Sequence, residues 1–203
     1  SQNSHGIKLS SPAHSSGQSY ELIFPTGNVT ADKVLKVASV SGSGATGVGQ
    51  LSFGDAGGIT SADMWHTSTS QTIGANSTTV VSSWVQEVYL GSAMSVSSGI
   101  WTFPSTGIYS IKYVAYVQQN SDISYITSYI QSTTDNSNYN NNAFSDLTHK
   151  NGYSIHNVST FFDVTNTSTH KVKFSHYAPS SFSLRGTSSE AQTYVQFIRL
   201  GDT

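Results

Sequence analysis

Residues 103–117, the stretch FPSTGIYSIKYVAYV, read as a turn and then one long strand whose side chains alternate between two faces. The first face is an ordinary core face, with Tyr109, Ile111, Tyr113, Ala115 and Val117. The second face also carries apolar side chains: Ile108, Val114 and Tyr116. The last strand has the same double character, because Tyr194, Ile198 and Leu200 alternate with Val195 and Phe197. A strand that is apolar on both faces needs a layer on each, and we predict that another chain supplies the second layer.

Similar short runs recur along the chain at the spacing of an antiparallel sandwich or jelly roll. The expected strands are residues 79–85, 88–90, 99–103, 107–118, 123–132, 153–164, 170–177 and 192–200. Only 10% of the residues are charged, and Ser, Thr, Asn, Gln and Gly supply most of the polarity, which favours strands over helices. We therefore predict an all-β chain whose main domain is residues 76–203.

The first 58 residues are organised differently, as short apolar strings separated by turn residues. No single string could build a core, so this segment fits either a stem or anchor built from several chains or an irregular arm lying on the main domain. Residues 59–75 are expected to be a connector, in which Ser61 caps one helical turn.

Composition excludes several classes of function. The formal net charge is −2, so the chain has no basic field for nucleic acid. It has no Cys, hence no disulfide or thiolate metal site, and it has no apolar run long enough to insert into a membrane.

Candidate chemistry is equally sparse. The seven histidines form no i,i+4 pair and no cluster with carboxylates at ligand spacing, so no metal site is expected. The string GSGATG at residues 42–47 has the spacing of a dinucleotide fingerprint, but the alternating residues after it cannot open a helix. There is no G-x-S-x-G elbow. We expect no cofactor and no enzymatic activity.

Three stretches carry a family resemblance: SGIWTFPSTGIYSIKYVAYV, FFDVTNTSTHKVKFSHY and TYVQFIRLGD. They resemble the trimeric jelly roll of the tumour necrosis factor (TNF) and complement globular-head superfamily, in particular the versions found in structural proteins of tailed bacteriophages. The motif residues are Phe103, Pro104, Gly107 and Tyr109, followed by an aromatic-rich last strand, Tyr194 to Leu200. The N-terminal segment resembles one that recurs in phage fibre and virion proteins.

The resemblance implies a homotrimer on a virion, outside the cell, whose N-terminal segment contacts other virion structural proteins. The apolar second faces would then pack around a three-fold axis. The candidate trimer-interface residues are Ile108, Val114, Tyr116, Tyr194 and Phe197.

A polar tract, residues 133–146, is too long for a hairpin turn and carries aromatic rings among amides. It is either a mobile loop or a loop that contacts a glycan or receptor on the host surface. The candidate contact residues are Tyr139, Asn140, Asn141, Asn142 and Phe144. The expected function is therefore a non-enzymatic fibre or decoration knob that contacts the host. The alternatives are a secreted carbohydrate-binding module and a glycan depolymerase appendage.

Overall fold

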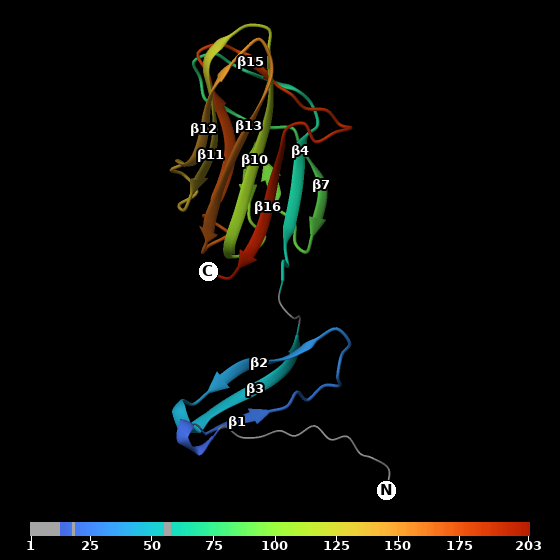
Figure 1. Ribbon diagram of the computed structural model, residues 1–203, viewed down its shortest axis with the longest axis vertical. Helices are drawn as coiled ribbons and strands as arrows, with labels where there is room; N and C mark the ends of the chain where they lie inside the picture. The colour runs from blue at the N-terminus through green and yellow to red at the C-terminus, as the bar shows by residue number, and fades with distance from the viewer. Residues whose placement is uncertain (1–12, 18, 55–57) are drawn as a thin grey trace. The chain divides into compact units, whose positions relative to one another are not determined.

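The computed structural model describes residues 13–17, 19–54 and 58–203. The chain divides into two compact units, residues 1–57 and residues 58–203 (Figure 1). We call them the N-terminal unit and the head. None of the helices in the described residues is long and apolar enough to cross a membrane.

The N-terminal unit is a small three-stranded sheet. Its elements are η1 (His14–Ser16), β1 (Tyr20–Ile23), β2 (Val34–Ser41), η2 (Gly44–Thr46) and β3 (Gly47–Gly54). β3 lies in the middle, parallel to β1 and antiparallel to β2. Every residue of β1 and β2 is exposed, and Leu51 is the one buried hydrophobic side chain among the described residues of this unit. Strands β1 and β2 thus bury almost nothing within one chain. One of the predicted apolar strings, residues 7–9, lies outside the described residues.

The head is a sandwich of two sheets, which we call sheet I and sheet II (Figure 1). Sheet I has the order β5 (Gln71–Ile73), β15 (Phe182–Leu184), β10 (Gly107–Gln119), β16 (Tyr194–Gly201), β4 (Ala62–Thr67), β7 (Trp84–Leu90), with β13 (Gly152–Val164) also paired to β10. Sheet II has the order β12 (Asn140–His149), β11 (Ile123–Thr133), β14 (Lys171–Tyr177), β9 (Ile100–Thr102), β8 (Ser95–Ser97), with β6 (Thr79–Val80) also paired to β14. All the strand pairings of the head are antiparallel, which confirms the predicted jelly-roll sandwich.

Aromatic side chains fill the space between the two sheets. Trp101 of sheet II lies 5.0 Å from Phe197 and 5.2 Å from Trp65, both of sheet I, as measured between ring centroids. Phe174 of β14 contacts the same group at 6.1 Å from Trp101. These rings hold the two sheets together through area burial and edge-to-face contact.

The Phe-Pro-x-x-Gly-x-Tyr motif locks the turn that leads into β10. The Tyr109 hydroxyl donates to the Ser105 carbonyl at 3.0 Å, and its ring lies 4.8 Å from that of Phe103. Gly107 has φ +140°, and a Cβ there would lie 2.5 Å from the Gly201 carbonyl oxygen. Only glycine allows the end of β16 to approach this closely.

Two sequence-based expectations were wrong. Residues 62–67 form strand β4 and residues 71–73 form β5, so the predicted connector with its helical turn belongs to sheet I. The tract at residues 133–146 is not one loop, because β12 begins at Asn140 and pairs with β11. Backbone pairing at a sheet edge does not need apolar side chains, which explains how an Asn-rich segment becomes a strand.

Candidate functional site

The outward face of sheet I is apolar over much of its area. Strand register places the following side chains on it: Tyr153, Ile155 and Phe161 of β13; Ile108, Val114 and Tyr116 of β10; Tyr194 and Ile198 of β16; Ala62 and Met64 of β4; Val85, Val88 and Leu90 of β7. Phe161, at 68% exposed, and several others are open to solvent within one chain. We call this surface the apolar face. Polar side chains, among them Lys112 and Gln196, lie between the apolar ones on the same face. Exposed apolar side chains gathered on one face of a sheet mark an interaction site.

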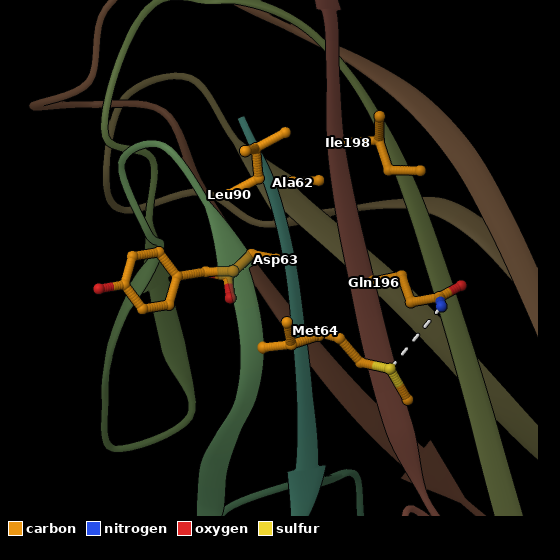
Figure 2. Close-up of a pocket in the computed structure, with 8 residues that line it drawn as sticks. Ala62, Asp63, Met64, Leu90, Gln196 and Ile198 are labelled. Carbon is orange, nitrogen blue, oxygen red and sulfur yellow. Dashed lines mark hydrogen bonds between the residues drawn. The ribbon is translucent and has the colours of Figure 1, made fainter. Parts of the chain in front are cut away.

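A shallow hollow of about 230 Å³ lies within the apolar face, between β7, β4 and β16 (Figure 2). Met64, Leu90 and Ile198 are among its lining residues, and the Gln196 side-chain nitrogen donates to Met64 Sδ at 3.8 Å. This contact engages the side-chain amide of Gln196 with another residue that lines the hollow. The hollow therefore presents mainly carbon and sulfur, which suits an apolar side chain from a partner.

Asp63 fixes the position of β7 beside β4. Its side chain is buried, Oδ1 accepts from Gln86 Nε2 at 3.1 Å, and Oδ2 accepts from the Met94 amide at 2.6 Å. Glu87 Oε2 of β7 also lies 2.8 Å from His66 Nδ1 of β4. A buried carboxylate with these partners is a structural clamp for the edge of the apolar face.

The five predicted interface residues do not all face the same way in the structure. Ile108, Tyr116 and Tyr194 point outward onto the apolar face, and Tyr116 stacks on Tyr153 at 5.4 Å. Val114 also points outward but is only 6% exposed in one chain. Phe197 needs a correction: it faces the core beside Trp101 and is 1% exposed, so it has no surface for a partner.

Sequence reasoning missed the contributions of two strands to this face. On β13, Tyr153, Ile155 and Phe161 fall on the face opposite His156, Val158 and Phe162. The period-two pattern that identified β10 could have found them. β7 was missed as an interface because a register shift interrupts its alternation between Val88 and Gln86.

The predicted contact residues lie at the edge of sheet II. Residues 134–139 form the turn, held by Asp135, whose carboxylate accepts from the amides of Ser137 and Asn138. These hydrogen bonds, led by that of the Asn138 side chain, lower the pKa of Asp135. Tyr139 is partly buried against Lys173, whose ammonium lies 4.1 Å from the ring centroid. The other four, Asn140, Asn141, Asn142 and Phe144, belong to strand β12 and are exposed.

A chain of hydrogen bonds crosses the interior between the sheets. Tyr113 Oη lies 2.5 Å from His176 Nε2, and Ser128 Oγ lies 3.0 Å from both His176 Nδ1 and His156 Nδ1. Burial lowers the pKa of His176 to about 3 and that of His156 to about 4, and in each case a neighbouring imidazole adds to the effect. Burial also raises the pKa of the Tyr113 hydroxyl. The side chains of Tyr113, His156 and His176 are therefore uncharged near pH 7, and both ring nitrogens of His176 take part in hydrogen bonds.

Among the residues that the structure describes, no three His, Cys, Asp or Glu side chains gather closely enough to hold a metal ion.

Comparisons with known proteins identify the fold. No family model and no curated protein matches the chain. Among solved structures, murine APRIL at pH 5.0 matches with a TM-score of 0.54 and 13% identity, over 69% of this chain and 98% of the APRIL chain. Eiger TNF from S. frugiperda matches with a TM-score of 0.53 and 9% identity, over 70% of this chain and 93% of its own. At such low identity the match shows the fold alone, and that fold is a TNF-like jelly roll.

Proposed function

We propose that the protein is a non-enzymatic homotrimeric knob, in which three heads associate through their apolar faces. The observation that carries this proposal is the apolar face itself, a sheet surface rich in exposed Tyr, Phe, Ile, Leu and Val beside a core that is already complete. Covering it would contribute about 25 cal/mol for each Å² of apolar surface removed from water. The stoichiometry of three rests on the resemblance of the sequence motifs to a trimeric superfamily.

The mass in solution tests this association. Light scattering after size exclusion, at micromolar concentration, should give three times the 21.7 kDa of one chain. A monomer or a dimer would contradict the proposal.

Two phenylalanines provide a matched pair of variants. Phe161, on the apolar face, and Phe144, on sheet II, are 68% and 63% exposed in one chain. Phe161→Asp should yield folded monomers, because association would bury a carboxylate without a partner. Phe144→Asp, the control, should remain trimeric. Trimers from both variants would exclude β13 from the interface.

We further propose that the knob is part of a phage particle and attaches it to the host surface. The N-terminal unit would bind other virion structural proteins, since it leaves apolar side chains exposed, such as Val40 of β2 and Phe24 just after β1. Peptide mass spectrometry of purified particles, with antibody labelling in electron micrographs, tests the location. Absence of the chain from particles of a phage that encodes it would refute this part. The purified knob should also release no reducing ends from host polysaccharide.

A further inference from the structure

A second hollow lies on the outward face of sheet II. It has a volume of about 360 Å³ and is lined by Tyr125, Thr127, Tyr129, Asn141, Phe144, Asp146 and Tyr177. This volume is at the small end of the range for ligand pockets, about 300–1,000 Å³. We call it the tyrosine hollow. Four of its seven lining side chains are aromatic, and its one carboxylate belongs to Asp146.

Strand register explains how these side chains meet. Thr127 in the central strand β11 pairs with Asp146 of β12 on one side and with Tyr177 of β14 on the other. Two residues further along β11, Tyr129 pairs with Phe144. The neighbours Ile126 and Ile130 are fully buried in the core, so the hollow stands on rigid paired backbone.

The aromatic rings form two neighbouring pairs. Tyr125 and Tyr177 have centroids 6.1 Å apart with planes 21° from parallel. Tyr129 and Phe144 have centroids 6.3 Å apart. Each pair limits the motion of its rings, which lowers the entropy lost when a ligand packs on them.

The side chains of Asp146 and Asn141 each use one polar atom in a hydrogen bond within the protein and leave the other polar atom available to a ligand. Asp146 Oδ1 accepts from Thr127 Oγ1 at 2.7 Å, and among the described residues no donor reaches Oδ2. Asn141 Oδ1 accepts from Gln131 Nε2 at 2.9 Å, and the side-chain nitrogen Nδ2 of Asn141 donates to no described residue. The hollow thus offers one oriented acceptor and one oriented donor beside aromatic rings.

We propose that the tyrosine hollow binds a neutral hexose unit of a glycan. A pyranose ring has a face of C–H groups, which packs on aromatic rings, and a rim of hydroxyls, which can both donate to Asp146 and accept from Asn141. An anionic sugar is disfavoured, because Asp146 would repel it and no Lys or Arg lines the hollow. A purely apolar ligand would leave Asp146 and Asn141 without partners.

This inference deepens the proposed attachment function and rests on it for its biological role. It takes up the contact residues predicted from the sequence but assigns recognition to strand side chains. Of those five, Asn141 and Phe144 line the hollow. The partners that complete it, Tyr125, Tyr129 and Tyr177, come from β11 and β14.

Saturation-transfer NMR on the full chain, with the methyl glycosides of glucose, galactose and mannose as probes, tests the site. At least one glycoside should bind saturably. Asp146→Asn keeps the shape of the side chain, Phe144→Ala removes an exposed ring, and each should weaken binding about tenfold or more, equivalent to about 1.4 kcal/mol. Tyr20→Ala is the control, because it removes an exposed tyrosine of the other unit. No binding of any glycoside, or equal binding by all variants, would overturn the inference.

Two further measurements separate this inference from the proposed function. Light scattering on the same samples reports association, so sugar binding by a monomer would uphold the hollow and contradict the trimer. If Asp146→Asn and Phe144→Ala remain trimeric, both should adhere to host cells less well than the parent, in proportion to their loss of sugar binding. Full adhesion by those variants would overturn the assignment of host attachment to the tyrosine hollow.

Discussion

Mild acid should destabilise the head through His156 and His176. Both imidazoles are buried, and their pKa values in the folded chain are about 4 and about 3. In the unfolded chain each returns to about 6.5. Because the unfolded state then binds more protons than the folded state, the stabilisation is complete above about pH 6.5 and is lost as the pH falls toward 4.

The size of the effect follows from these values. Between pH 7 and pH 5 each histidine of the unfolded chain goes from about one quarter protonated to almost fully protonated, which favours unfolding by about 2 kcal/mol per histidine. Together they would remove about 3 to 4 kcal/mol from a domain whose total stability is about 5–15 kcal/mol. For a domain of this size the midpoint of thermal unfolding, Tm, should fall by roughly 10 °C.

The window from pH 7 to pH 5 isolates the histidines from the carboxylates. The pKa values of Asp122 and Asp135 are lowered, so these groups support the fold at higher pH and lose that contribution only well below pH 5. The loss between pH 7 and pH 5 therefore reports the buried imidazoles.

Scanning calorimetry at one fixed protein concentration is the suitable assay, since association would make Tm depend on concentration. The double variant His156→Asn, His176→Gln cannot titrate in this range. It should be less stable than the parent at pH 7.5 and should lose much less of its Tm by pH 5. A parent whose Tm is constant across the window, or a double variant with an undiminished loss, would refute the reasoning.

Three further predictions concern the core, a turn and the apolar face. Phe197→Asp should yield insoluble or unfolded protein, whereas Ile198→Asp should give soluble monomers by light scattering, because these adjacent side chains face the core and the apolar face respectively. Soluble trimers from both would contradict that assignment. Gly107→Ala should reduce the free energy of urea unfolding by about 2 kcal/mol or more, because its Cβ would clash with the end of β16; Gly27→Ala, in open space, is the control. Asp135→Ala should lower Tm at pH 7 but leave the trimer intact, since it loosens only the β11–β12 turn; dissociation would show that this turn takes part in assembly.

Alternation along the chain was sufficient to predict the long central strands. The predicted strands at residues 107–118, 123–132 and 170–177 match β10, β11 and β14 to within one residue at each end. These strands bury one face in a continuous core, so side-chain pattern and structure must agree there. His176 lies on the inner face of β14 together with Val172 and Phe174.

Other features depend on contacts that the sequence does not display. The start of β4 resembled a capped helical turn in the sequence. The partners that hold Asp63 in the strand, Gln86 and Met94, are distant along the chain and give no local signal. β12 had no apolar pattern because an edge strand is held by backbone pairing. For a strand apolar on both faces, such as β16, the pattern separates the two faces but does not say which one is the core. That is why Phe197 was assigned to the wrong side.

The sparse burial in the N-terminal unit has a consequence for the order of assembly. A three-stranded sheet with Leu51 as its one buried hydrophobic side chain among the described residues gains too little from its own packing to offset the entropy of ordering its backbone. Three heads that associate would hold three such units at a local concentration in the millimolar range, far above that of free chains. Pairing among the units, or with a particle, then becomes an intramolecular step. Residues 19–54 expressed alone should show little amide-exchange protection, and the same residues attached to trimeric heads should be protected.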